Sequence, residues 1–377
     1  MSARRTRVMH IVYSFHVGGL ENVIVQLINR LPVDRYEHLL LSLTDMGEFA
    51  QRIRTPGVEL VSLHKPPGHA IPLYPRLFRE MRRWRPDVVH TCNLAALEVV
   101  PIAWAAGVPR RIHAEHGWDA HDPDGRNVKF QRLRKVYKPF VSHHIAVSKD
   151  LDAYLARAIG VPAHRRSLIA NGVDTSVFRP APAQRPVPAG CPFVPGEHWL
   201  FGTVGRMQTV KNQPMLARAF VQWVQQSPAS SARARLVMVG DGPLRTEVEA
   251  ILSQAGLSDR AWLPGARSDI ADILQSLDCF VLPSDAEGTS CTLQEAMACG
   301  LPSVATAVGG TPDLLLHGAS GTLVPPGQPQ ALADALQRQV EYPAQAKAQG
   351  DAARQQACAH FSVDSMVAHY DQLFQGS

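Results

Sequence analysis

Short apolar runs alternate with amphipathic helical patterns along nearly the whole chain. This alternation is typical of parallel sheets covered by helices, because each return to a parallel strand needs a long crossover. The first half contains seven strand candidates, at 8–13, 38–43, 58–63, 88–91, 112–115, 145–147 and 168–169. The second half contains six more, at 199–204, 236–239, 261–263, 279–282, 303–305 and 322–324. The pattern therefore predicts an α/β protein with two similar domains.

A proline-rich segment, 179–195, separates the two halves. Its prolines exclude a helix or a central strand, so we expect a linker or surface loop there, with a hinge near 171–180. Open α/β sheets bind ligands outside the carboxyl ends of their strands. The residues directly after each predicted strand are therefore the first candidates for chemistry.

The composition is that of a folded globular protein. Of 377 residues, 45% are hydrophobic and 19% are charged, which excludes the disordered class. The most apolar stretch, 88–108, is interrupted by His90 and Glu98, so no transmembrane helix is predicted. The six cysteines show no Cys-x-x-Cys pair and no zinc-site spacing, and His10 and His16 interrupt the apolar start, which is unlike a signal peptide. We therefore expect a reduced, cytoplasmic chain.

Charge is unevenly distributed along the chain. The total is +5, but residues 1–170 hold 25 Lys and Arg against 15 Asp and Glu, a net of +10, and residues 171–377 hold 13 against 18, a net of −5. A positive half is typical of proteins that meet nucleic acid, an anionic membrane or a phosphorylated acceptor. The sequence has no helix-turn-helix signature and no basic run interleaved with stacking aromatics, so no nucleic-acid partner is expected.

Two loops after predicted strands have the composition of an anion site. Gly18 and Gly19 follow the first strand and precede a helical run, so their amides can point from a helix N-terminus towards an anion; the alternative is a turn that serves geometry only. Gly205 and Arg206 follow the first strand of the second half, and Lys211 starts the next helix. The guanidinium and the ammonium would bracket a diphosphate, unless both are ordinary solvated cations.

The loop after the fourth strand of the second half offers carboxylates. Glu287 and Gly288 lie on this loop, Thr289 and Ser290 open the next helix where amide groups are free, and Glu295 lies inside that helix. Two glutamates eight residues apart arise easily by chance, so the position after a strand, and not the spacing, makes this segment a candidate. Carboxylates placed there can accept hydrogen bonds from sugar hydroxyl groups.

Among the 16 histidines, His116 is the functional candidate, because it lies between the end of a strand and a glycine. The alternative is a structural histidine. Asp241 and Asp285 are interpreted as turn residues, so no metal ligand is assigned. The pair Gly240 and Gly242 lacks the third glycine of a dinucleotide fingerprint.

Seven motifs occur in an order that is similar to that of the retaining GT-B glycosyltransferases of family four, and the resemblance spans the chain. They are Gly18-Gly19, 113–117 (HAEHG), 171–174 (NGVD), Gly205-Arg206 with Lys211, 240–243 (GDGP), 287–295 and 309–312 (GGTP). Within that family the chain resembles bacterial sugar transferases of exopolysaccharide clusters, including those associated with the exosortase system. One departure is Cys92, where many relatives have a second histidine two residues after His90.

The resemblance implies a fold of two Rossmann-like, doubly wound domains that face each other across a cleft. It implies that 1–172 binds the acceptor and that 173–357 binds the nucleotide sugar. The segment 358–377 has apolar residues at helical spacing, and the resemblance implies that this helix crosses back onto the first domain. Those apolar residues are Phe361, Met366, Tyr370 and Leu373.

The resemblance gives four residues a catalytic role, namely His116, Arg206, Lys211 and Glu287. Arg206 and Lys211 would neutralise the donor diphosphate, while Glu287 would face the transferred sugar and His116 would lie near it. Because no carboxylate nucleophile is placed, we expect a front-face substitution in which the leaving diphosphate helps to deprotonate the incoming hydroxyl.

Eight further residues are implied to bind the donor: Gly18, Gly19, Gly205, Arg267, Gly288, Thr289, Ser290 and Glu295. Glu295 would accept hydrogen bonds from the ribose hydroxyls, and Arg267 would line the nucleobase pocket. The backbone of Gly288 and Thr289 would meet the sugar. No cofactor and no metal ion are implied, since cationic side chains and helix amides take the place of a divalent ion.

The implied activity is transfer of a sugar from a nucleotide-diphosphate sugar to an acceptor, with retention at the anomeric carbon. The acceptor would be a lipid-linked or polysaccharide intermediate of envelope or exopolysaccharide synthesis. Two alternatives remain open. One is a GT-B sugar-nucleotide epimerase with similar phosphate contacts, and the other is a non-catalytic, nucleotide-sugar-binding scaffold of an envelope assembly.

Two basic stretches, 76–85 and 126–140, predict peripheral attachment to the inner face of the cytoplasmic membrane. In the first, five arginines surround Leu77, Met81 and Trp84. In the second, the cations Arg126, Lys129, Arg132, Arg134, Lys135 and Lys138 flank a stripe of Phe130, Leu133, Val136, Tyr137 and Phe140. We expect the second stretch to bind anionic lipid more strongly. The alternative is that both stripes pack on the domain core and the cations are merely solvated.

Overall fold

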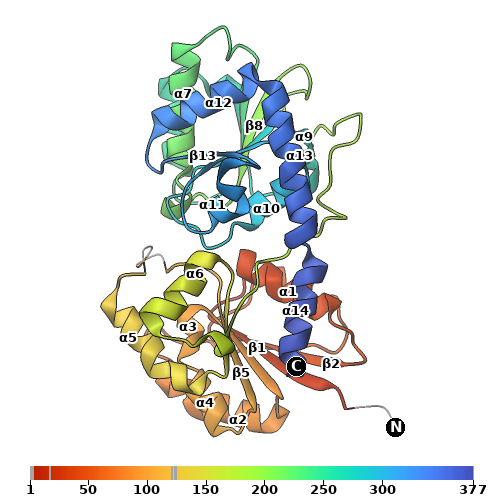
Figure 1. Cartoon of the computed structure of the whole chain (residues 1–377), viewed down its shortest axis with the longest axis vertical. Helices are drawn as coiled ribbons and strands as arrows, with labels where there is room; N and C mark the ends of the chain where they lie inside the picture. The colour runs from red at the N-terminus through yellow and green to blue at the C-terminus, as the bar shows by residue number, and fades with distance from the viewer. Residues whose placement is uncertain (1–3, 17, 120–121, 123–124, 377) are drawn as a thin grey trace. The chain divides into compact units, whose positions relative to one another are not determined.

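The computed structural model (Figure 1) describes residues 4–16, 18–119, 122 and 125–376. The chain divides into two units, one made of Met1–Gly172 with Val363–Ser377 and the other of Val173–Ser362. Each unit contains one parallel sheet with apolar cores and helices on both faces. The prediction of an α/β chain with two Rossmann-like, doubly wound sheets is confirmed, and all seven plus six predicted strands are present.

The sheet of the first unit has the strand order β3-β2-β1-β4-β5-β6-β7. The strands are β1 (Thr6–Val12), β2 (Tyr36–Ser42), β3 (Glu59–Ser62), β4 (Val88–Cys92), β5 (Arg110–Glu115), β6 (His143–Ala146) and β7 (Arg166–Leu168). The helices are α1 (Gly19–Arg30), α2 (Tyr74–Trp84), α3 (Asn93–Leu97), α4 (Val100–Ala105), α5 (Val128–Tyr137), α6 (Lys149–Tyr154) and α14 (Val363–Gln375). The strand order reverses between β1 and β4, and such switch points are where doubly wound sheets bind ligands.

Alternation along the strands gives this sheet two apolar faces. On β1, Val8 and Val12 pack in the cluster that contains α1 and α14, while Met9 and Ile11 pack in the cluster that contains α2 and α4. The last helix, α14, runs beside α1 (Figure 1) and buries Tyr370 and three other apolar side chains in the first cluster. The end of the chain therefore completes the core of the first unit.

The segment 358–377 is not one helix in the structure. α13 (Pro343–His360) ends in the second unit, and α14 begins at Val363. Between them the backbone N–H of Val173 donates to the carbonyl of Phe361 at 2.8 Å, and this short extended segment breaks the helix. Phe361 accordingly packs against the core of the second unit, whereas Met366 is buried in the first.

A row of buried histidines crosses the sheet face that α14 covers. His38, His10 and His90 lie on the adjacent strands β2, β1 and β4. His10 Nδ1 is 3.1 Å from His90 Nδ1, and His10 Nε2 is 3.2 Å from His38 Nδ1. The rings of His90 and Tyr370 pack edge to face with centroids 5.5 Å apart. Polar rings therefore occupy positions that aliphatic side chains would fill in a purely apolar core.

The sheet of the second unit has the strand order β10-β9-β8-β11-β12-β13. The strands are β8 (Trp199–Val204), β9 (Ala234–Val239), β10 (Ala261–Gly265), β11 (Cys279–Leu282), β12 (Ser303–Thr306) and β13 (Thr322–Val324). The remaining helices are α7 (Gln213–Gln226), α8 (Arg245–Gln254), α9 (Ile270–Ser276), α10 (Cys291–Ala298), α11 (Thr311–Leu314) and α12 (Pro329–Glu341). The strand order reverses between β8 and β11, which places the switch point between the two loops that the motifs occupy.

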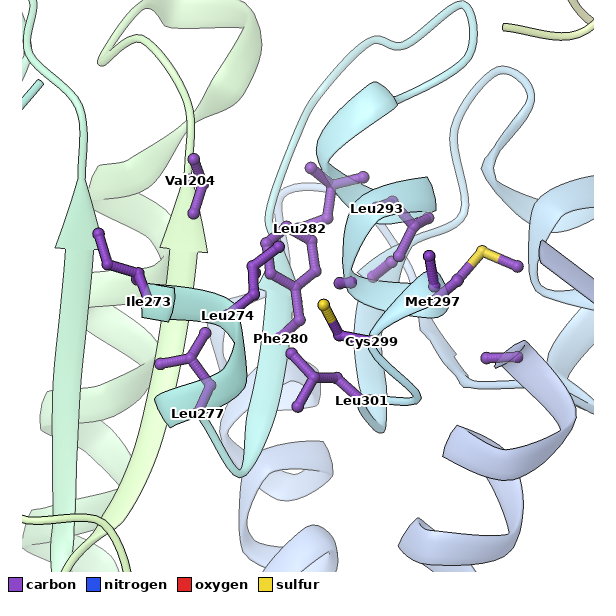
Figure 2. Close-up of a cluster of buried hydrophobic side chains, with 14 of the residues drawn as sticks. Val204, Ile273, Leu274, Leu277, Phe280, Leu282, Leu293, Met297, Cys299 and Leu301 are labelled. Carbon is purple, nitrogen blue, oxygen red and sulfur yellow. The ribbon is translucent and has the colours of Figure 1, made fainter. Parts of the chain in front are cut away.

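Figure 2 shows the apolar core that holds β11 between α9 and α10. Phe280 and Leu282 enter this core from β11, and Leu274 and Leu293 enter it from the two helices; all four side chains are buried. The core therefore fixes both ends of the loop that carries Glu287.

The sequence predicts no transmembrane helix and reduced cysteines. No helix in the described part of the chain is long and apolar enough to cross a membrane. All six cysteines are free thiols, and Cys92, Cys279 and Cys299 are buried.

We predict that the first unit loses stability as the pH falls below about 6.5. Burial lowers the pKa of His38 to about 4 and that of His144 to about 3, so both rings are neutral in the folded chain. The unfolded chain takes up these protons near pH 6.5. The stabilisation is therefore complete above that pH and is lost progressively below it, at about 2 kcal/mol per histidine between about pH 7.5 and 5. Urea unfolding across this pH range is the measurement.

Two variants make that measurement specific. His38→Asn keeps a polar partner for His10 and removes one titrating ring, so its urea midpoint should depend less on pH than that of the wild type. His360→Gln changes an exposed residue of α13 and should leave the pH dependence unchanged. A wild-type midpoint that does not move between neutral and mildly acidic pH would contradict the account.

Candidate functional site

The loops after β8 and β11 meet at the switch point of the second unit. Arg206 follows β8 directly and is exposed, and its guanidinium has no hydrogen bond or ion pair with any residue that the structure describes. Lys211 ends a short 3-10 helix, Thr209–Lys211, on the same loop. Its Nζ lies 2.6 Å from Oε1 of Glu287, which comes from the loop after β11. Two of the predicted catalytic residues, Lys211 and Glu287, therefore form an ion pair. A third, Arg206, lies on the same loop as Lys211.

Glu287 is a buried carboxylate with a built-in counter-charge. Its side chain is 6% exposed, whereas that of Lys211 is 29% exposed. The hydroxyl of Ser284 donates a second short hydrogen bond, of 2.6 Å, to the same carboxylate oxygen. A buried carboxylate without such partners would cost several kcal/mol, so the ammonium and the hydroxyl offset the cost of burying Glu287 there.

Asn212 and Asp285 tie the two loops together. Asn212 has a left-handed backbone, with φ of 44°, and its side chain caps α7 by accepting from the N–H of Met215 at 3.2 Å. Its amide nitrogen donates to both carboxylate oxygens of Asp285 at 3.0 Å. The N–H of Asp285 in turn donates to the carbonyl of Val210 at 2.9 Å. Asp285, predicted as a turn residue, therefore helps to hold the Lys211 loop against the Glu287 loop.

Three glycines with positive φ let neighbouring loops press against these two. A Cβ at Gly240 would lie 2.0 Å from the carbonyl oxygen of Gly205, and one at Gly242 would lie 2.5 Å from that of Met207. A Cβ at Gly309 would lie 1.7 Å from the carbonyl oxygen of Glu287. These are contacts with backbone, which cannot move aside as a flexible side chain can. The loops that carry Arg206 and Glu287 are therefore fixed by backbone packing.

The predicted donor-binding residues after Glu287 form the start of α10. Ser290 is its N-cap and accepts from the N–H of Leu293 at 3.3 Å, so its hydroxyl is already engaged. The carbonyl of Gly288 accepts from the N–H of Gly310 at 3.0 Å. Thr289 is buried beside this cap, and Glu295 is half-buried in the second turn of the helix.

Arg267 lies on the loop after β10 and is held by a carboxylate. Its Nη2 and Nε lie 2.6 and 2.8 Å from the two oxygens of Asp269, and its Nη1 donates to the carbonyl of Ala189 at 3.2 Å. The hydrogen bonds from Arg267 hold the pKa of Asp269 below its usual range. The guanidinium plane is thus oriented, while its contact with a nucleobase stays a prediction.

In the first unit, His116 lies beside the end of β5 with its ring buried. Its backbone N–H donates to Oδ1 of Asn93 at 2.8 Å, and Asn93 has a left-handed backbone, with φ of 59°. Burial lowers the pKa of His116 to about 4, against a hydrogen bond with Asn171 that raises it. The ring is therefore neutral at pH 7 and can exchange hydrogen bonds but carries no charge. Two of the sequence motifs, those of His116 and Asn171, meet here.

Gly18 precedes α1, and Gly19 is its first residue. A Cβ at Gly18 would lie 2.2 Å from a carboxylate oxygen of Glu21. The glycine therefore leaves space for a carboxylate of the helix's own first turn, at the positive end of the helix dipole. An external anion at this turn, as predicted from the two glycines, would have to share the position with Glu21.

Arg134, predicted as one of the lipid-facing cations of the stretch 126–140, is buried and does not face lipid. Its Nε and Nη2 lie 2.6 and 3.1 Å from the two carboxylate oxygens of Glu115 on β5, and both side chains are buried. Burial alone would raise the pKa of Glu115, but the Arg134 guanidinium outweighs it and holds that pKa well below its usual range. The sequence signal for this ion pair was the glutamate of the HAEHG motif, because a carboxylate in a buried strand needs a cationic partner.

The two basic stretches differ in what they bury. On α2, Leu77, Met81 and Trp84 are all buried in the core, so the alternative of core packing holds for the stripe of 76–85. On α5, by contrast, the only buried residue is Arg134, and Val136 is 62% exposed. Of the apolar stripe of 126–140, Val136 is therefore accessible in the first unit, while Tyr137 and Phe140 are partly buried against a small apolar cluster.

Comparisons with known proteins place the chain in a family. Residues 17–177 match the family model described as Glycosyltransferase Family 4, and residues 199–341 match the one described as Glycosyl transferases group 1. The two matches follow the division into two units. The chain therefore belongs to the glycosyltransferases, with a family 4 domain followed by a group 1 domain, and its fold is GT-B.

The sequence identity to individual relatives is below 30% for the two described here. The chain is 26% identical, over 85% of its length and 84% of the relative's, to the UDP-Gal:alpha-D-GlcNAc-diphosphoundecaprenol alpha-1,3-galactosyltransferase of Escherichia coli. It is 29% identical to the D-inositol 3-phosphate glycosyltransferase of Kineococcus radiotolerans, over 73% of this chain and 63% of that one. It spans less than two thirds of the first curated relatives, from 44% to 63% of their length.

Among solved structures, that of Anabaena HepE in complex with UDP and glucose matches 99% of this chain and 100% of its own, with a TM-score of 0.82. The sequence identity is 22%. Likeness at this level of identity shows a shared fold. The roles of individual residues therefore rest on the geometry described above.

We predict that Gly309→Ala displaces the Glu287 loop, because the new Cβ would overlap the carbonyl oxygen of Glu287. Gly327→Ala is the matched control, since Gly327 also has positive φ, of 68°, but no heavy atom lies within 4 Å of the added Cβ. The free energy of unfolding of the control should fall by only about 1 kcal/mol, which is the cost of an alanine in a left-handed backbone conformation. Gly309→Ala should lose at least about 2 kcal/mol more in the free energy of unfolding of the second unit, measured in urea. Equal losses in the two variants would remove the packing argument.

Proposed function

We propose that the chain transfers a sugar from a nucleotide-diphosphate sugar to a lipid-linked or polysaccharide intermediate, with retention at the anomeric carbon. One observation supports this above all. At the switch point of the second unit, an exposed guanidinium and a partly exposed ammonium lie on one loop that backbone packing fixes, and the ammonium is paired with a buried carboxylate. Two cations at the carboxyl end of a parallel sheet suit a diphosphate, and a carboxylate beside them suits sugar hydroxyls.

The proposed reaction exchanges one bond for another at the anomeric carbon. The bond from this carbon to the diphosphate oxygen breaks, a bond to the acceptor oxygen forms, and the acceptor proton passes to the leaving diphosphate. Arg206 and Lys211 stabilise the negative charge that develops on the leaving group. Glu287 is already engaged by Lys211 and Ser284, which makes it a poor covalent nucleophile and supports substitution on the front face.

The cationic pair also supports a transfer that needs no divalent ion, because two positive side chains supply the charge that a metal would bring to the diphosphate. The acceptor class is supported by the name of the E. coli relative, which contains a sugar linked to diphosphoundecaprenol. Solved relatives hold UDP, glucose or UDP-glucose, which supports a nucleotide-sugar donor for this chain too. The role of His116 at the transferred sugar stays a prediction.

We predict that Arg206→Ala lowers turnover by about 2 to 4 kcal/mol of transition-state stabilisation, or about 30- to 1000-fold, and leaves stability unchanged because the side chain is exposed. Lys211→Ala should lose a similar amount of turnover and also destabilise the second unit, since Glu287 then has no counter-charge. Arg218→Ala, on the exposed side of α7, is the control and should behave as the wild type. The measurement is the rate at which each variant releases nucleoside diphosphate.

Thermal unfolding with nucleoside diphosphates separates the alternatives. A nucleotide at 100 times its dissociation constant adds about 2.7 kcal/mol of stability. Stabilisation together with transfer to acceptor supports the proposal, and normal turnover in both Arg206→Ala and Lys211→Ala would sink the diphosphate assignment. Stabilisation with an epimerised sugar instead of transfer would favour the epimerase. Binding without any turnover would favour the scaffold.

We propose in addition that α5 attaches the enzyme to anionic lipid. Lys129, Arg132 and Lys135 are exposed on this helix. Val136 is exposed beside them, and Trp104, which is 58% exposed, stacks edge to face on Phe140 with centroids 5.5 Å apart. Exposed apolar side chains such as Val136 and Trp104 next to basic residues are the combination that binds a membrane interface. A lipid-linked acceptor would present such an interface to the enzyme.

We predict that binding to vesicles increases with anionic lipid and decreases with salt. Changing Lys129, Arg132 and Lys135 to glutamate should weaken it by about 3 kcal/mol or more, at about 1 kcal/mol for each lost cation. Changing Arg79 and Arg82 of α2 and Arg85 directly after it to glutamate is the matched control, because Leu77, Met81 and Trp84 of that helix are buried, and should weaken binding less. Sedimentation with vesicles is the measurement. Equal recovery on neutral and anionic vesicles at low salt would refute attachment through α5.

A further inference from the structure

Three metal-binding side chains meet at the switch point of the first unit. His90 and Cys92 are two residues apart on β4 and so face the same side of the sheet, and His116 follows β5, whose Ala114 pairs with Cys92. One nitrogen of each imidazole and the Sγ of Cys92 all lie within 4.8 Å of one another. His90 Nε2 is 3.7 Å from that Sγ. No second group of three such side chains gathers in the described part of the chain.

The donor set is one that zinc prefers. Imidazole nitrogens and thiolates are the ligand types of tetrahedral zinc sites, and zinc sites with three protein ligands keep a fourth position open. With Zn–N bonds of about 2.0 Å and Zn–S bonds of about 2.3 Å, the ligand atoms of such a site are roughly 3.4 to 3.6 Å apart. The separations here, all within 4.8 Å, exceed those values by up to about 1.4 Å, which side-chain rotations can close.

The histidine row orients His90 for ligation. With His90 Nε2 towards the cluster, His90 Nδ1 lies 3.1 Å from His10 Nδ1, and His10 Nε2 lies 3.2 Å from His38 Nδ1. A metal on His90 Nε2 requires the proton on Nδ1, which then donates to His10, and His10 donates to His38. Partners of this kind fix the tautomer and ring orientation of metal-binding histidines.

A second observation points to a ligand at the same place. The hydroxyl of Tyr370 on α14 is buried and has no hydrogen-bond partner among the described residues. Its ring packs edge to face on His90 with centroids 5.5 Å apart, which brings Tyr370 next to the cluster. A buried hydroxyl without a partner is rare in folded proteins. A water molecule held in the fourth position of a metal would give this hydroxyl its partner.

We propose that His90, Cys92 and His116 bind one zinc ion. The Zn–S bond forms as the thiol of Cys92 gives its proton to solvent, and the two imidazoles bind as neutral rings. The ion is not part of the proposed transfer reaction. It holds His116 away from the sugar and so inhibits the enzyme reversibly, a second step that rests on the proposed function.

Cobalt(II), which takes the same ligands as zinc and is coloured, is the probe for the site. The full chain, freed of metal with a chelator and kept reduced, should bind one equivalent of Co²⁺. The spectrum should show tetrahedral ligand-field bands together with a thiolate-to-cobalt charge-transfer band. Zn²⁺ should displace the cobalt, whereas Mg²⁺, which prefers oxygen ligands, should not. A wild-type chain that binds no Co²⁺ would overturn the site.

Three variants assign the ligands. Cys92→Ala should lose the charge-transfer band and bind zinc more than roughly 100-fold more weakly, since even outer-shell partners contribute 10- to 100-fold. Cys92→His should still bind one Co²⁺, through three imidazoles, but without the charge-transfer band. Cys279→Ala removes a buried thiol of β11 in the other unit and should match the wild type. A charge-transfer band of wild-type intensity in a folded Cys92→Ala chain would overturn the assignment.

Activity tests the second step separately. Zinc should stop transfer by the wild type, a chelator should restore it, and Cys92→Ala should stay active at the same zinc concentration. If the chain binds cobalt but zinc does not change its transfer rate, the proposed inhibition is wrong and the proposed metal site remains supported. Cobalt binding in a chain that shows no transfer under any condition would overturn the proposed function instead.

Discussion

Backbone-to-backbone packing at three glycines is the constraint on which the candidate site depends. Gly240 and Gly242 let the loop after β9 press on the loop of Arg206, and Gly309 lets the loop after β12 press on Glu287. Because backbone atoms cannot move aside as side chains do, these contacts fix where the cations and the carboxylate lie. Charge that is positioned before a ligand arrives stabilises a reaction without reorganisation, which is how electrostatic catalysis works.

The two units use one architecture for different purposes. At its switch point the second unit leaves a guanidinium exposed and supports it with backbone contacts. At the corresponding point the first unit buries imidazoles, a thiol and the Glu115–Arg134 ion pair. Buried polar groups cost stability unless all are satisfied, and the two hydrogen bonds from Arg134 to Glu115 offset part of that cost. The returning helix α14 closes this edge with Tyr370.

The strands and their parallel order could be predicted from the sequence, because apolar runs and crossover helices are local patterns. The residues after β8 and β11 could also be predicted, since the rule for parallel sheets needs only the strand ends. The ion pair of Arg134 and the proximity of Cys92 to His116 could not be predicted, because they depend on which strands are neighbours and in what register. For the same reason a search for zinc spacings along the chain misses ligands that two strands contribute.

The central claim is that the fixed loops of the second unit hold the diphosphate of a nucleotide sugar. A crystal structure of the full chain with a bound nucleoside diphosphate tests it most directly. We expect phosphate oxygens within hydrogen-bond distance of the Arg206 guanidinium and of Lys211 Nζ, with the loops of Gly205 and Glu287 unmoved. A diphosphate bound elsewhere, with Lys211 still paired only to Glu287, would contradict it.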